Sequence, residues 1–244
     1  VLAQVDDGDA SFRNAVGGSI TATSNSGIAV GAEVDGYSAS AVNKGAIRAI
    51  GGAGAAGLSA VASYGFAKLD NFGSVTAVGY QAYGAQVGSN YGSVLLQNHG
   101  TITALGTLSA TGGRAVASYG TVTANNTGTI SVGSSTTAHG IVASAQEVNL
   151  YNGGDIFTSA YSGLSVGIDV TAHGDVAVHN YDYVEADSVF GMAKGISPYG
   201  DGRAAERIAT LVDLTVRRNT PARDQAWMPT PPLTPPPSDG IAAR

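Results

Sequence analysis

Three tyrosines occupy the same position in successive copies of a repeating sequence, and their spacing suggests a ligand-binding surface. Tyr64, Tyr91 and Tyr119 are each followed by glycine, and each precedes a recurring asparagine by seven residues. A tyrosine ring has a large apolar face and a polar hydroxyl, so a row of rings could stack against the sugars of a glycan. The column continues as Ala145 and His173. The column is interpreted either as a packing ladder that shields a turn or as an exposed aromatic strip, which makes these three tyrosines a candidate glycan-stacking site.

Carboxylates suggest a second chemistry, the acid–base cleavage of polysaccharides. They concentrate in the last two copies of the repeat, as Asp155, Asp169, Asp175, Asp182, Glu185 and Asp187. A polysaccharide-cleaving enzyme needs carboxylates that converge on the scissile bond. Here they fall at outward-facing positions or in turns, which favours a solvated acidic face. A β-helix lyase or hydrolase is kept as the alternative function, and it requires three or more carboxylates in one groove.

Other cofactor and metal motifs are weaker. The segment Gly52-Ala-Gly54-Ala-Ala-Gly57 fits the glycine spacing of a dinucleotide-binding turn, with Asp70 near the place of a ribose-binding carboxylate. No helical periodicity follows Gly57, so a glycine-rich turn between repeats is the better interpretation. The histidines fall at different offsets without metal-ligand spacing, at His99, His139, His173 and His179. With no cysteine in the chain, we predict neither a cofactor nor a metal site.

These residues lie in a chain that is built from copies of one sequence motif, and the motif recurs at intervals of 26 to 28 residues. Each copy has asparagine, then glycine two residues later, then isoleucine or valine at the fourth residue, except that the last copy has Asp182 in place of glycine. The asparagines are Asn43, Asn71, Asn98, Asn126, Asn152 and Asn180. A period in this range is typical of solenoids, in which each repeat buries its apolar face against its neighbours.

Apolar and polar residues alternate with period two on both sides of each asparagine. The residues four positions after it are β-branched in every copy, namely Ile47, Val75, Ile102, Ile130, Ile156 and Val184. This alternation predicts two strands joined at a corner. A third apolar stretch precedes each pair, as at 57–65 and 140–145. Three short strands per copy predict one triangular turn of a parallel β-helix, about seven coils in all.

The corner between the two strands leads to two expectations. Glycine two residues after the asparagine suggests a backbone with positive φ, and Asp182 is a residue type that tolerates this conformation. The asparagines themselves should stack and hydrogen-bond along the solenoid axis, as Asn ladders do in stacked parallel sheets.

The repeats resemble a known group of proteins over roughly residues 8–196. The Asn-x-Gly-x-Ile-x-Ala phrases, the run Gly-Asp-Val-Ala-Val-His-Asn at 174–180 and the Gly/Ala/Ser/Thr-rich spacers look like passenger repeats of bacterial autotransporters and filamentous-haemagglutinin-like surface proteins. The resemblance implies a right-handed parallel β-helix, secreted across the outer membrane of a Gram-negative bacterium and displayed at the cell surface, often as an adhesin. It also implies a C-terminal β-barrel in a full-length relative, so that this sequence would be a fragment or truncated product.

The repeat domain is expected to span residues 1–196, followed by a non-repeat tail at 197–244. The tail holds all 8 prolines of the chain and its only tryptophan. Residues 203–218 have apolar residues at helical spacing and could form a short helix. The proline-rich remainder from Pro221 is expected to be irregular and disordered. Two origins stay open, a natural linker and out-of-frame translation of a repeat gene.

Composition narrows the function further. The net charge of −6 and the scattered basic residues, 12 in total, speak against nucleic acid as a partner. No run approaches the ~18 apolar residues of a membrane span. Ice or mineral binding through Thr-x-Thr arrays is weakened because Thr101 and Thr103 align with other residue types in other copies. We expect a non-catalytic structural or adhesive segment whose partners are host or cell-surface glycans or proteins.

Overall fold

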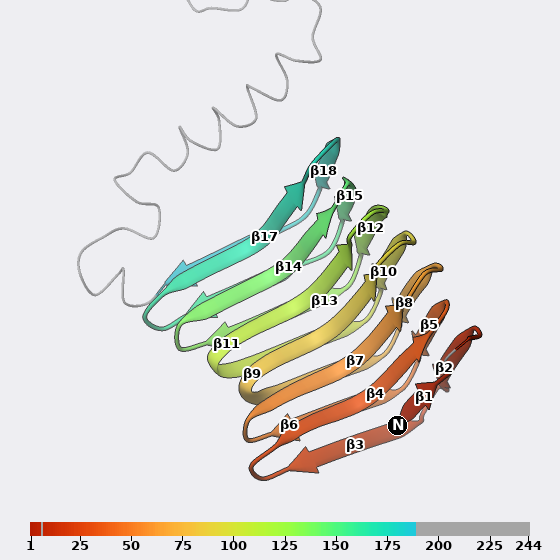
Figure 1. Ribbon diagram of the computed structural model, residues 1–244. Coiled ribbons are helices and arrows are strands. Elements are labelled where there is room, and N and C mark those ends of the chain that lie inside the picture. The colour runs from red at the N-terminus through yellow and green to blue at the C-terminus, as the bar shows by residue number, and fades with distance from the viewer. Residues whose placement is uncertain (6, 189–244) are drawn as a thin grey trace, which may run out of the picture. The chain divides into compact units, whose positions relative to one another are not determined.

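The computed structural model describes residues 1–5 and 7–188, which form a parallel β-solenoid without helices (Figure 1). Three strands per coil give the solenoid three faces. Face 1 is a seven-stranded sheet that ends at the recurring asparagine. Its strands are β2 (Ala10–Asn14), β5 (Ala39–Asn43), β8 (Ala67–Asn71), β10 (Val94–Asn98), β12 (Thr121–Asn126), β15 (Glu147–Asn152) and β18 (Val176–Asn180).

Faces 2 and 3 together form a twelve-stranded sheet, because β9 and β11 run through the corner between them. Face 2 contains β3 (Ser19–Ser24), β6 (Ala46–Gly51), the first parts of β9 (Ser74–Ser89) and β11 (Thr101–Ala117), β13 (Thr129–Ser134), β16 (Ile156–Ala160) and β19 (Val184–Ser188). Face 3 contains β1 (Leu2–Gln4), β4 (Ile28–Gly36), β7 (Gly54–Ala62), the second parts of β9 and β11, β14 (Thr137–Ala145) and β17 (Leu164–Ala172).

All strand pairs are parallel, and equivalent residues of successive copies lie side by side. On face 1, Asn71 pairs with Asn43 and Asn98. On face 2, Ile102 pairs with Val75 and Ile130. The sequence prediction of a parallel β-helix with three strands per copy and about seven coils is confirmed. In Figure 1 the coils follow one another from the red first strands to the blue last ones.

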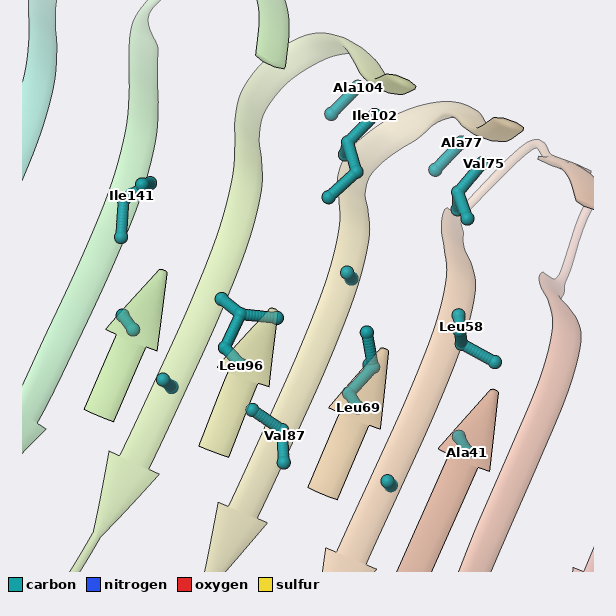
Figure 2. Close-up of a cluster of buried hydrophobic side chains, with 14 of the residues drawn as sticks. Ala41, Leu58, Leu69, Val75, Ala77, Val87, Leu96, Ile102, Ala104 and Ile141 are labelled. Carbon is teal, nitrogen blue, oxygen red and sulfur yellow. The ribbon is translucent and has the colours of Figure 1, made fainter. Parts of the chain in front are cut away.

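The inward residues form a predominantly apolar core. The predicted β-branched column is buried from Ile47 to Ile156, and Val184 in the last described coil is half-buried. Facing this column, strands of face 3 carry glycines, and a Cβ on Gly84 would overlap the side chain of Ile102. Figure 2 shows the apolar side chains of facing strands, among them Leu58 and Leu69, converging in the interior. The glycines therefore make room for the branched side chains opposite them.

A ladder of asparagine amides runs along one corner of the core, as predicted. Each Nδ2 donates to the Oδ1 of the asparagine in the next coil, over 2.7 to 2.8 Å. The series is Asn14, Asn43, Asn71, Asn98, Asn126, Asn152 and Asn180. All but the last are buried. Because a buried amide without a partner costs free energy, the ladder satisfies groups that the core could not otherwise hold.

The prediction of positive φ at the corner glycines is wrong. Among the described residues only Gly17 has a positive φ, of 77°, so neither the glycines after the asparagines nor Asp182 adopts that conformation. The reason for glycine is close approach between coils. A Cβ on Gly73 would overlap the carbonyl oxygen of Gly45, and one on Gly100 would overlap that of Gly73. Glycine is required here by the neighbouring coil and not by its own backbone angles.

The expectations for the end of the chain lie outside the described residues. These are the last part of the repeat domain, at 189–196, and the tail at 197–244 with its predicted helix at 203–218 and proline-rich segment.

A pair of substitutions tests which side chains point inward. Ile102 is 0% exposed, whereas Thr103 is half-buried on the outer surface of face 2. Ile102→Asp would bury a charge without a partner and should lower the free energy of unfolding by roughly 3–5 kcal/mol or prevent folding. Thr103→Asp should change it by no more than about 0.5 kcal/mol. Equal shifts of the two urea midpoints would contradict the assigned orientation of this strand.

A second pair tests why glycine occupies the corner. Gly100→Ala should lower the free energy of unfolding by roughly 1–3 kcal/mol, because the new methyl group collides with the preceding coil. Gly88→Ala is the control, since its Cβ would meet only the carbonyl oxygen of Val116 at 3.7 Å, and its effect should stay within about 1 kcal/mol. Thermal unfolding of both variants measures the difference. A well-tolerated Gly100→Ala would refute the close-approach explanation.

Candidate functional site

The turns between face 3 and face 1 carry the tyrosines that the sequence singled out. These turns are bonded to one another from coil to coil, which fixes their positions. The backbone N–H groups of Tyr64 and Gly65 both donate to the carbonyl of Tyr37, over 3.3 and 2.7 Å. In the next coil, the Ser89 hydroxyl donates to the carbonyl of Gly65 and accepts from the N–H of Gly92, both over 2.9 Å. The side chains on these turns consequently project at regular intervals along the axis.

Four tyrosines form one stacked column on these turns, and we call Tyr37, Tyr64, Tyr91 and Tyr119 the tyrosine strip. Successive ring centroids are 5.8, 5.0 and 5.4 Å apart, with interplanar angles of 24°, 6° and 10°. In the same order the residues are 50%, 58%, 58% and 68% exposed. The structure thus brings Tyr64, Tyr91 and Tyr119 together on the surface.

The rings in the strip are slipped relative to one another. Parallel rings in contact are separated by about 3.5–4.0 Å between their planes, whereas the strip follows a strand spacing of about 4.8 Å. Offset stacking accommodates this difference. The inner rings, Tyr64 and Tyr91, each have a stacked ring on both sides and are 58% exposed. A ligand lying along the strip would meet four aromatic rings at intervals of 5.0 to 5.8 Å.

Tyr37 belongs to the strip although the sequence analysis missed it. It precedes Asn43 by six residues instead of seven, because Ser38 leads directly into the strand that begins at Ala39. Its ring nevertheless stacks on Tyr64. A column counted from a fixed asparagine assumes turns of constant length, but this turn has two residues, at 37–38, whereas those at 63–66 and 90–93 have four. The recurrence of tyrosine two or three residues before the first residue of a strand of face 1 was the signal that could have identified it.

The predicted continuation of the column through Ala145 and His173 is wrong. Ala145 is 4% exposed and ends β14, where it pairs with Ala172 in the row of inward residues. The backbone N–H of His173 donates to the Ala145 carbonyl, so His173 is the next residue after that buried row. The turn after β14 is shorter than those of the preceding coils, since β15 already begins at Glu147. The strip ends at Tyr119.

The six carboxylates of the last copies are spread over several parts of the solenoid. Glu185 and Asp187 on β19 help to line a surface hollow of about 290 Å³. Asp169 lies on face 3, with its Oδ2 3.4 Å from His139 Nδ1. Asp155, Asp175 and Asp182 lie in turns before strands. Of the six, two share the hollow.

The glycine-rich segment at 52–57 and the histidines do not form a cofactor or metal site among the described residues. Gly54 and Gly57 lie in β7, which continues into a turn, whereas a phosphate-binding glycine loop precedes a helix N-terminus. Within the described residues, no three His, Cys, Asp or Glu side chains are arranged to hold a metal ion.

A second column of side chains follows the asparagine corner, on the other edge of face 1. Phe72 and His99 stack with ring centroids 4.8 Å apart. His99 Nδ1 lies 2.8 Å from Thr127 Oγ1, and Lys44 Nζ lies 5.4 Å from the centroid of Phe72. The sequence analysis missed this column because its members are chemically different, and only their common position after the asparagine relates them.

Comparison with protein-family models, with curated proteins and with solved structures gives no match to this chain. Within residues 1–188, no helix has the length and apolar character needed to cross a membrane.

The stacking energy of the strip can be measured at its centre. Tyr91 contacts a ring on each side, and an aromatic pair contributes roughly 0.5–1.5 kcal/mol. Tyr91→Ala should therefore lower the free energy of unfolding by about 1–3 kcal/mol. Tyr91→Phe keeps both stacks, removes only the hydroxyl and should remain within about 0.5 kcal/mol of the parent. If both variants unfold at the same denaturant concentration as the parent, the stacks contribute nothing to stability.

Proposed function

We propose that this protein is a non-catalytic surface scaffold that binds extended glycans along the tyrosine strip. The observation that carries the proposal is the alignment of four rings, each at least half exposed, in one stacked column. Single exposed aromatic residues are common on protein surfaces, whereas a contiguous exposed apolar patch marks an interaction site. Sugars suit such a surface, since they offer apolar ring faces to aromatic groups and hydroxyls to the tyrosine oxygens.

The scaffold beneath the strip supports this role. The strip is carried on turns that are hydrogen-bonded from coil to coil, above strands whose pairing is in register. Rings fixed in this way do not have to be ordered when a ligand binds, so less conformational entropy is lost. Each ring alone binds weakly, whereas several rings contacting one chain act together through their high effective concentration.

Display at the surface of a Gram-negative bacterium is the cellular setting we propose, on the basis of the resemblance to autotransporter passenger repeats. The absence of cysteine is compatible with secretion of an unfolded chain through a pore. In this setting the solenoid serves as an adhesin or a structural spacer, and its partners are host or cell-surface glycans or proteins. Polysaccharide cleavage is the less favoured function, because the hollow at β19 is lined by two carboxylates, Glu185 and Asp187.

A glycan array tests the proposal directly. The parent chain should bind extended glycans, and replacing all four tyrosines of the strip by alanine should abolish binding while the β-sheet circular dichroism is retained. The matched control replaces four tyrosines outside the strip that are 41–69% exposed, namely Tyr80, Tyr151, Tyr161 and Tyr181, and it should bind like the parent.

Two results would contradict the glycan proposal. One is a parent chain that binds nothing on a broad array, which would leave the solenoid as a spacer. The other is equal loss of binding in the strip variant and the control variant. If the strip variant is less stable than the parent, binding is compared at a temperature where circular dichroism shows both to be folded.

A further inference from the structure

We infer that the tyrosine strip selects uncharged glycan chains, lying along the solenoid axis, and discriminates against anionic ones. This inference rests on the proposed function and adds the class of ligand. It follows from the residues around the rings and from the charges at the two ends of the strip.

The residues beside the rings in these turns are uncharged. Each of Tyr64, Tyr91 and Tyr119 is followed by glycine, and the residues just before them are Ser63, Asn90 and Ser118. Besides the tyrosines, the one large side chain in the turns at 63–66, 90–93 and 118–120 is Phe66, which is apolar and 46% exposed. Ser63, Asn90 and Ser118 offer hydroxyl and amide groups to sugar hydroxyls. An extended chain can therefore lie across several rings, in the direction in which they are stacked.

Both ends of the strip are acidic. At the first end, the N–H of Tyr37 donates to the carbonyl of Gly8 over 2.8 Å, which places the exposed residues Asp7 and Asp9 in the adjacent turn. At the other end, the exposed Glu147 accepts a hydrogen bond of 3.4 Å from the hydroxyl of Thr121. An anionic chain spanning the strip would approach carboxylates at both ends.

The basic residues nearest in sequence do not offset these charges. Lys68, four residues after Tyr64, has its Nζ 2.8 Å from an Asp70 carboxylate oxygen. Arg114 precedes Tyr119 by five residues of mostly extended chain, about 16 Å at the rise of a strand. That distance is about twice the Debye length of ~8 Å at physiological ionic strength. Arg13, on β2, follows Asp9 by four residues, about 13 Å at the rise of a strand. The turns that carry the rings, at 37–38, 63–66, 90–93 and 118–120, thus lack the basic groups that recognise carboxylated or sulfated sugars.

Binding of matched neutral and carboxylated glycans by the full chain tests this selectivity. Cellotetraose and its counterpart oxidised to carboxylate at C6 are one pair, and further pairs on an array cover other linkages. One unit-charge contact at a few Å in water corresponds to roughly a fivefold change in binding constant. We expect the carboxylated member of a bound pair to bind at least about fivefold more weakly at low ionic strength. The difference should shrink at 1 M salt, where the Debye length is about 3 Å.

Charge-neutralising variants test whether the carboxylates at the two ends of the strip cause the weaker binding of carboxylated glycans. Asp7→Asn, Asp9→Asn and Glu147→Gln combined should reduce the discrimination between neutral and carboxylated glycans. The control combines Asp169→Asn, Glu185→Gln and Asp187→Asn, which changes the net charge equally on other parts of the solenoid and should leave the discrimination intact.

The outcomes separate this inference from the proposed function. Neutral and carboxylated members that bind equally, or a carboxylated member that binds more tightly, would overturn the charge selectivity and leave glycan binding standing. The same holds if both combined variants reduce the discrimination to the same extent. A parent chain that binds no glycan of either kind would overturn the proposed function and the selectivity with it.

Discussion

Backbone hydrogen bonds between parallel strands hold successive coils about 4.8 Å apart, and every column of side chains in this protein is subject to that distance. Residues at equivalent positions meet their counterparts in the coils before and after, as Asn98 meets Asn71 and Asn126. A residue type is therefore retained where it packs well with itself. Asparagine amides, tyrosine rings and branched aliphatic side chains do so, and each of these residue types forms a column along the solenoid.

The same distance restricts charge. Like charges placed directly opposite each other on neighbouring strands repel, so a charged residue cannot simply recur in every coil. Arg48 lies between Thr21 and Thr76 on the outer surface of face 2. Lys68 and Asp70 form their ion pair along a single strand. With 12% charged residues in the chain, most of the outer surface can be covered by Ser, Thr and Ala without such conflicts.

Sequence reasoning correctly predicted the features that recur in every repeat. It failed for features that arise from contacts between neighbouring coils, because the sequence of one repeat does not show these contacts. The period, the inward column through Ile102 and the asparagine ladder all follow from recurrence. The reason for glycine at Gly73 could not be inferred from backbone preferences, because the obstacle is a carbonyl oxygen of the neighbouring coil. Tyr37 was missed and Ala145 was misplaced because turn lengths vary, and only three-dimensional pairing shows where a turn has lost residues.

The asparagine ladder has a direction. In each of its six hydrogen bonds the amide of one coil is the donor and the amide of the following coil is the acceptor. Hydrogen bonds joined in this manner polarise one another. A completed coil therefore offers the next segment of chain an unused N–H group at a fixed place. Assembly of such a solenoid resembles the extension of a polar filament, in which each added unit is oriented by the one before it, and nearest-neighbour contacts suffice to propagate order along the molecule.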